Sequence, residues 1–186
     1  MNTFKAILHT SAAMATVLLL SAANATEFKL SSPELRPMQP IAAEHYWNNF
    51  GCSGDNVAPK LIWENPPVGT KSFAITFYDQ DAPTGSGFWH WVVYNIPASI
   101  TTLEGGKNAG ALPVGAIQSN TDLSKPGFVG PCPPVGRKHR YLWTVHALKV
   151  EKLPVEPRMS PALVGFFIGE QRIGQAQLTV IAGPRR

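Results

Sequence analysis

The sequence predicts a mainly β domain with one helix near the C-terminus. Three features support this fold class: a length of 186 residues, a content of 16 glycines and 17 prolines, and several short segments with the character of strands. The length leaves room for one domain, or at most two very small ones. The glycine and proline content is above average and has no period, which indicates many tight turns. A helical bundle and a coiled coil are therefore excluded.

Four segments are expected to form β-strands. In the first, Phe73, Ile75 and Phe77 alternate with smaller residues, which is the period of a strand. The second is rich in aromatic and β-branched residues and stops at Pro97. The predicted strands are residues 71–78, 88–96, 140–150 and 177–181.

The pattern changes to a helical one after Met159. Ser160 is a suitable N-cap, and Pro161 suits the first helical position. We expect the helix to run from Pro161 to about Gly174.

The first 25 residues have the character of a signal peptide. Lys5 precedes a short apolar stretch at residues 12–20, and Ala23 and Ala25 are the small residues that a signal peptidase requires. The apolar stretch is too short for a membrane anchor, which needs about 20 residues. We expect cleavage after Ala25, which leaves residues 26–186 as one exported domain.

The charge distribution argues against nucleic-acid binding. The formal net charge is +4, and the basic residues are scattered. The densest cluster, residues 137–140, lies inside an expected binding loop and forms no basic stripe.

The two cysteines, Cys52 and Cys132, favour one disulfide over two buried thiols in an exported protein. Chain-entropy models give such a bridge, closing a loop of roughly 80 residues, a value of about 4 kcal/mol. The spacing matches no zinc framework.

Asp79 and Asp81 are the first candidate for a functional site. They follow the first predicted strand directly, and residues two apart in an extended chain point the same way. Two carboxylates there fit acid–base or metal chemistry. The alternative is a turn in which aspartate oxygens accept from nearby backbone N–H groups.

His90 and a proline-rich loop are the other candidates. On a regular strand, His90 shares a face with Val92 and Tyr94, where a histidine is more often part of the core than a ligand. The loop at residues 130–136 holds three prolines and two glycines, and is followed by His139 and Tyr141 on one side of the next strand. The alternative for this loop is a rigid turn.

Taken together, these motifs resemble the phosphatidylethanolamine-binding protein family, in particular its bacterial Raf-kinase-inhibitor-like branch. The likeness extends from about residue 28 to about residue 181. Its blocks are NVAP at 56–59 with Leu61 and Trp63, DQDAP at 79–83, HW at 90–91, NIP at 95–97, GPCPP at 130–134 and HRY at 139–141.

The resemblance implies a fold of two packed antiparallel β-sheets with a few peripheral helices. It also implies a small anion-binding pocket without a metal or another cofactor. One departure is Gln80, which stands where the family usually has proline, so we expect a change in loop stiffness and an intact site. The pocket residues implied are Asp79, Asp81, His90, Gly130, Cys132, Pro134, His139 and Tyr141.

The expected function is non-enzymatic binding of a phosphate or phosphoethanolamine head group, with a kinase or a protease as an inhibited partner. Hydroxyl, imidazole and backbone N–H groups can donate to phosphate oxygens. Asp79 could be protonated, hold a histidine in its charged form, or accept from the amine of a zwitterionic ligand.

Two other functions stay open: an acid–base hydrolase or isomerase, and a protein-interaction factor such as a secreted protease inhibitor. The sequence has no P-loop, nucleophile elbow or zinc-protease motif, which argues against the enzyme. The bacterial branch implies a periplasmic location, although the leader itself indicates only export.

Overall fold

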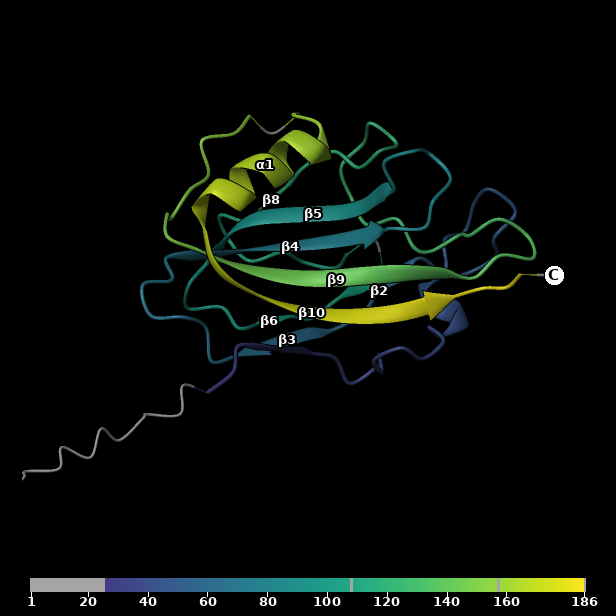
Figure 1. Ribbon diagram of the computed structural model, residues 1–186, viewed down its shortest axis with the longest axis horizontal. Helices are drawn as coiled ribbons and strands as arrows, with labels where there is room; N and C mark the ends of the chain where they lie inside the picture. The colour runs from purple at the N-terminus through teal and green to yellow at the C-terminus, as the bar shows by residue number, and fades with distance from the viewer. Residues whose placement is uncertain (1–25, 108, 157, 186) are drawn as a thin grey trace, which may run out of the picture.

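The central feature of the computed structural model, which describes residues 26–107, 109–156 and 158–185, is a five-stranded antiparallel sheet. Figure 1 shows this large sheet running across the middle of the molecule. Its strands, in spatial order, are β10 (Arg172–Ala182), β9 (His139–Leu148), β4 (Ser72–Asp79), β5 (Phe88–Pro97) and β8 (Ile117–Gln118). The expected leader at residues 1–25 lies outside the described residues.

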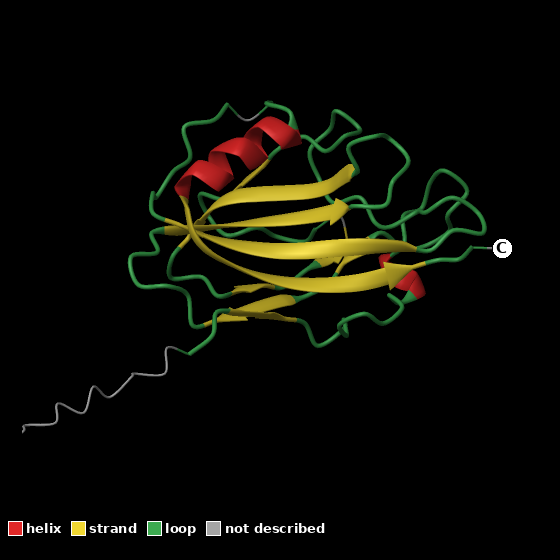
Figure 2. Ribbon diagram, viewed as in Figure 1, coloured by secondary structure: helices red, strands yellow, loops and turns green. Residues whose placement is uncertain are grey.

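Two smaller antiparallel sheets and two helical segments complete the fold (Figure 2). The three-stranded sheet contains β1 (Lys29–Ser31), β3 (Leu61–Glu64) and β6 (Thr102–Leu103), and the two-stranded sheet pairs β2 (Val57–Ala58) with β7 (Gly106–Lys107). A 3-10 turn, η1 (Ala43–His45), precedes β2, and the α-helix α1 (Pro161–Gln171) precedes β10. In the described ranges, neither helical segment is long and apolar enough to cross a membrane.

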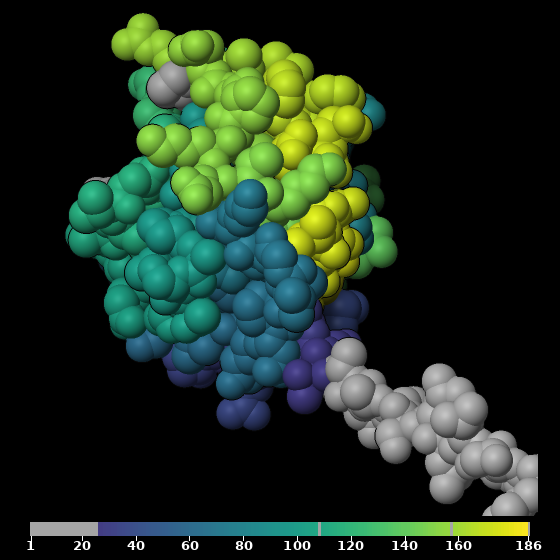
Figure 3. Space-filling view, turned by 90° about the vertical axis from the view of Figure 1, so that its left-hand side faces the viewer, coloured from purple at the N-terminus to yellow at the C-terminus, as the bar shows by residue number. Residues whose placement is uncertain are grey.

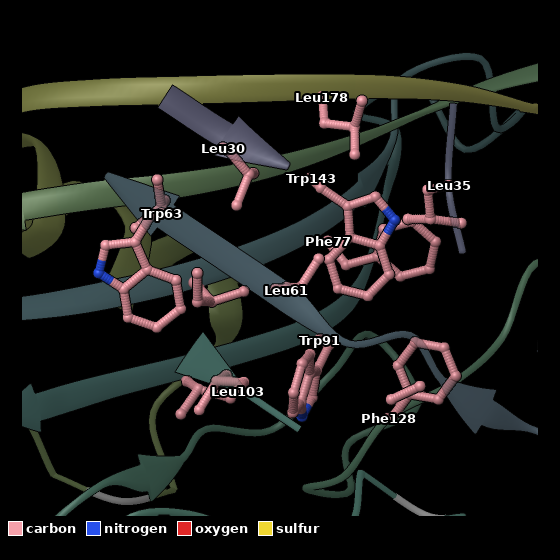
Figure 4. Packing of buried hydrophobic residues seen from close by; sticks show 14 of the residues in the cluster. Leu30, Leu35, Leu61, Trp63, Phe77, Trp91, Leu103, Phe128, Trp143 and Leu178 are labelled. Atoms are coloured by element: carbon pink, nitrogen blue, oxygen red, sulfur yellow. The ribbon is translucent and has the colours of Figure 1, made fainter. Parts of the chain in front are cut away.

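The large sheet is covered on both faces. On one face its aromatic side chains, including Phe77 and Trp143, pack against Leu61 and Trp63 of the three-stranded sheet (Figure 4). On the other face, Val164 and Ile168 of α1 pack on strand residues. Burial of apolar side chains on both faces stabilises the sheet, and the expectation of packed antiparallel sheets is confirmed.

The predicted elements agree with the structure apart from their ends. The first three predicted strands match β4, β5 and β9 within two residues. The Ser160 hydroxyl caps α1 by accepting from the Leu163 N–H, as the sequence indicated. The helix ends at Gln171, earlier than expected, because Arg172 already belongs to β10. Ladder pairing with β9 therefore decides the conformation of this segment. The short strands β1, β2, β3, β6, β7 and β8 were not predicted.

One face assignment is wrong and matters for the site. Trp91 pairs with Phe77 and Trp89 pairs with Tyr78, so a bulge leaves His90 as an extra residue in β5. The bulge turns His90 toward Phe77 and Tyr141, away from the face of Val92 and Tyr94 under α1.

The large sheet has two distinct ends. The end of β4 and the start of β9 meet near the right-hand end in Figure 1, where the chain also finishes. Figure 3 views the opposite end, where α1 and neighbouring C-terminal residues form the yellow-green surface at the top. The candidate site lies at the first of these ends.

Candidate functional site

A cavity of about 340 Å³ lies at the end of the sheet where β4 finishes and β9 begins. It contains six of the eight residues that the sequence implied. They are Asp79, His90, Cys132, Pro134, His139 and Tyr141. The remaining wall is mostly apolar, with the aromatic rings of Trp47, Phe50 and Phe88 among its components.

Asp79 and His139 form a buried polar pair in this cavity. Asp79 is the last residue of β4 and His139 is the first of β9. The His139 Nδ1 lies 2.7 Å from Asp79 Oδ2, and both side chains are almost fully buried. Asp79 Oδ1 accepts from the Asp81 N–H at 2.9 Å. Both carboxylate oxygens therefore have partners, and the Asp79 contact fixes the orientation of the His139 ring.

His90 is buried and neutral. Its Nδ1 donates to the carbonyl oxygen of Val129 at 2.9 Å. Burial lowers the pKa of His90 to about 4, although this hydrogen bond and the charge of Asp79 favour the protonated form. A neutral ring that donates from Nδ1 carries a lone pair on Nε2. In this state His90 can accept a hydrogen bond from a ligand and cannot donate one from Nε2.

Tyr141 supplies a donor. Burial, followed by the nearby charge of Asp79, raises the pKa of the Tyr141 phenol well above its usual value. The hydroxyl therefore keeps its proton. The ring packs tilted against Phe77 and nearly edge-on against His90, with centroid distances of 5.6 and 5.2 Å.

Asn56 holds in place the loop whose Val129 carbonyl accepts a hydrogen bond from His90. Its Nδ2 donates to the Phe128 carbonyl at 3.0 Å, and its Oδ1 accepts from the Gly130 N–H at 2.8 Å. Both hydrogen bonds are buried, and they hold the residues on either side of Val129. The Val129 carbonyl in turn accepts from the His90 ring and fixes its orientation. Gly130 has a packing role, because a Cβ there would overlap the His45 carbonyl oxygen. Gly130 itself does not line the cavity.

Asp81 faces away from Asp79. Its carboxylate accepts from the Arg140 backbone N–H at 2.8 Å and from the guanidinium at 2.9 and 2.6 Å. The Arg140 side chain lowers the pKa of Asp81. The chain turns after Asp79, so the expectation that both carboxylates share one side does not hold. Asp81 instead lines a neighbouring groove, together with Arg137, Lys138 and Arg140.

A disulfide joins Cys52 to Cys132, with a Cα–Cα distance of 5.9 Å. It ties the loop that carries Trp47 and Phe50 to the proline-rich loop of the cavity. The two rings pack edge to face at 4.8 Å, and Phe50 is 69% exposed. Trp47 and Phe50 are not among the site residues predicted from the sequence, although two aromatic residues just before a bridged cysteine are a usable signal.

The cavity combines a carboxylate–imidazole pair, a neutral imidazole and a protonated phenol. In the described part of the chain, no group of three or more His, Cys, Asp or Glu side chains is arranged to hold a metal ion. The available chemistry is hydrogen bonding to a small polar group inside a largely apolar wall.

Comparison with known proteins places the chain in a family. Residues 31–182 match the family described as phosphatidylethanolamine-binding protein. The Escherichia coli proteins YbcL and YbhB, both described as UPF0098 proteins, are 46% and 45% identical over 163 and 155 residues. These alignments cover 86% and 82% of this chain, and 89% and 98% of the relatives. A putative lipoprotein of Mycobacterium tuberculosis, LppC, is 32% identical over 80% of this chain and 69% of its own length.

Solved structures agree with this result. The crystal structure of E. coli YbcL, described as a new member of the mammalian family, has a TM-score of 0.82 at 44% identity. The structural alignment covers 86% of this chain and 99% of the YbcL chain. A homologue from Chlamydia trachomatis has a TM-score of 0.70 at 26% identity, covering 83% of this chain and 95% of the homologue. This chain therefore belongs to the phosphatidylethanolamine-binding protein family.

Proposed function

We propose that this protein binds a small phosphate-bearing head group, of the phosphoethanolamine type, in the cavity at the end of β4 and β9. The observation that carries the proposal is the buried contact of 2.7 Å between Asp79 and His139, set beside the protonated Tyr141 in a largely apolar cavity. A volume of about 340 Å³ suits a head group. The descriptions of the family and of its E. coli relatives name no catalytic activity.

Each polar group has a distinct role in this proposal. Phosphate oxygens accept from the Tyr141 hydroxyl and from the His139 ring, whose orientation the Asp79 carboxylate fixes. The Nε2 lone pair of His90 accepts from the ammonium group of the ligand. A regulatory effect on a kinase or protease partner would follow from occupancy of this cavity.

The experiment is calorimetric titration of the oxidised protein with phosphoethanolamine and with inorganic phosphate. The Tyr141→Phe variant removes one hydroxyl and keeps the packed ring. Loss of a hydrogen bond to a charged group lowers affinity about tenfold or more. Tyr94→Phe is the matched control, because Tyr94 is equally buried, lies under α1, and has a hydroxyl without a partner among the described residues.

Binding that weakens in Tyr141→Phe and is unchanged in Tyr94→Phe would support the proposed site. Absence of heat with both ligands, or equal weakening in the two variants, would refute it. A His90→Ala variant tests the proposed contact with the ammonium group. It should weaken binding of phosphoethanolamine more than binding of inorganic phosphate, which has no ammonium group.

We also propose that the protein is exported, with residues 1–25 removed. The Cys52–Cys132 disulfide fits an oxidising compartment, and one relative is a putative lipoprotein. N-terminal sequencing of protein recovered from outside the cytoplasm should begin at Thr26. Recovery of the intact chain from the cytoplasm alone would contradict export.

A further inference from the structure

A second polar depression, which we call the basic groove, adjoins the cavity. It has a volume of about 620 Å³ and shares Pro83, Pro134 and His139 with the cavity wall. The groove and the cavity are therefore neighbours at this end of the large sheet. The groove's other lining residues are Asp81, Arg137, Lys138 and Arg140.

The groove carries an excess of positive charge. Asp81 and Arg140 neutralise one another through contacts at 2.6 and 2.9 Å. Arg137 and Lys138 are both exposed, and neither side chain makes a hydrogen bond or an ion pair with any residue in the described ranges. Two positive charges in the groove thus lack a partner within the described chain.

The backbone that carries these two cations is held in place. The Arg137 N–H donates to the Pro134 carbonyl at 3.1 Å, and the Gly136 N–H donates to the Arg185 carbonyl at 3.0 Å. Gly136 has a φ of 75°, a left-handed conformation that glycine adopts without strain. The loop therefore presents Arg137 and Lys138 at a defined place beside the cavity.

The cavity has little positive charge of its own. The Asp79 carboxylate is paired with His139, and burial keeps His90 neutral with a pKa of about 4. Phosphate carries up to two negative charges, so its attraction to this end of the molecule depends on nearby unpaired cations. The described residues that supply them at the groove are Arg137 and Lys138.

We propose that the basic groove is a second anion subsite, and that the ligand is a phosphate ester carrying a further anionic group. This inference rests on the proposed function, since it places the phosphate in the cavity. Arginine can bind a carboxylate or a phosphate with two parallel hydrogen bonds, and lysine adds a point charge. The favoured ligand class is a head group of the phosphoserine type, which has phosphate, ammonium and carboxylate groups.

The test compares two probes that differ by one carboxylate, phosphoethanolamine and O-phosphoserine, by calorimetry of the oxidised protein. Phosphoserine should bind about threefold to tenfold more tightly, because one carboxylate meets two exposed cations. The gain should shrink between about 0.05 and 0.5 M salt, as screening by ions increases. The variant Arg137→Ala/Lys138→Ala should lose this preference, so that phosphoserine and phosphoethanolamine bind it with affinities within about threefold of one another.

A matched control removes two exposed cations from the other end of the sheet. Lys71 directly precedes β4 and Lys149 directly follows β9, so both lie at the end opposite Asp79 and His139. The variant Lys71→Ala/Lys149→Ala has the same change in net charge, and should retain the preference for phosphoserine. If both variants lose this preference equally, the preference comes from the overall charge of the protein, and the proposed subsite is wrong.

The outcomes separate this inference from the proposed function. If phosphoethanolamine binds and phosphoserine binds no more tightly, the subsite is wrong and the head-group cavity stands. If neither probe binds, both proposals fail. Sedimentation with phosphatidylserine vesicles, against phosphatidylcholine vesicles, distinguishes the two sources of the head group. If binding to phosphatidylserine vesicles is lost in Arg137→Ala/Lys138→Ala, the natural ligand is a lipid. If only binding of soluble phosphoserine depends on these two residues, the natural ligand is a free metabolite.

Discussion

Replacement of Asn56 by alanine should destabilise the protein strongly, because this side chain bonds two buried backbone groups. Asn56 is 5% exposed. Its amide donates to the Phe128 carbonyl at 3.0 Å and accepts from the Gly130 N–H at 2.8 Å. Truncation leaves both groups without partners in the interior, and each such group costs about 1–3 kcal/mol.

The backbone conformation adds a further cost. Asn56 has a φ of 55°, and alanine in the left-handed region loses about 1 kcal/mol or more. We therefore expect the free energy of unfolding to fall by about 4 kcal/mol. Denaturant unfolding followed by tryptophan fluorescence measures this value, since the chain contains 5 tryptophans.

Asn65→Ala is the matched control for the backbone cost. Asn65 also has a φ of 55°, but it is exposed, and its amide makes one bond, of 3.2 Å, to the Glu27 carbonyl. Water can replace that bond, so we expect a loss of about 1–2 kcal/mol. Equal losses in the two variants would show that the buried bonds of Asn56 contribute nothing beyond the conformational preference of asparagine, which would refute the reasoning.

Three further predictions concern stability. Replacing Cys52 and Cys132 by serine should lower the free energy of unfolding by about 2–5 kcal/mol, and an unchanged denaturation midpoint would contradict this. Burial lowers the pKa of His90 to about 4 and of His146 to about 3, whereas the unfolded chain binds these protons near pH 6.5. Stability should therefore fall as pH drops from 6.5 to 4, by roughly 1 kcal/mol per pH unit for each histidine, and His146→Gln should flatten this dependence in unfolding measurements at pH 7 and 5. The Arg185 guanidinium donates to the carbonyls of Pro133 and Gly51, in two cavity loops, at 2.6 and 2.7 Å. Arg185→Ala should therefore lower the free energy of unfolding by about 1–3 kcal/mol. A thermal midpoint equal to that of the wild type would contradict a stabilising role for these two bonds.

Much of the fold could be predicted because the long strands carry their signal locally. The alternation at Phe73, Ile75 and Phe77 predicts β4, and the Ser160–Pro161 pair predicts the start of α1. The two-residue strands β2 and β7 carry no such signal, since they form through pairing with distant partners. Their existence depends on tertiary contacts and not on local preference.

The site was predicted only in part, for reasons of geometry. The sheet face predicted for His90 is wrong because of a bulge in β5. The position of that bulge depends on the register between β4 and β5, which the local sequence does not reveal. Asp81 was grouped with Asp79 because an extended chain was assumed, whereas the Asp81 N–H turns back to Asp79 Oδ1. The turn, which is the alternative interpretation of this motif, is therefore present. Trp47 and Phe50 were missed because the disulfide brings them to the cavity from a loop that is remote in sequence.

Nitrogen-15 NMR of the histidine side chains, recorded as phosphoethanolamine is added at neutral pH, tests the central claim most directly. Before addition, His90 should give the signals of a neutral ring protonated at Nδ1, as its bond to Val129 requires. With ligand, the His139 and His90 signals should both shift, while those of His146, on the face of the sheet that α1 covers, should not. A response of His146 equal to theirs, or no response of His139 and His90 at saturating ligand, would contradict binding in this cavity.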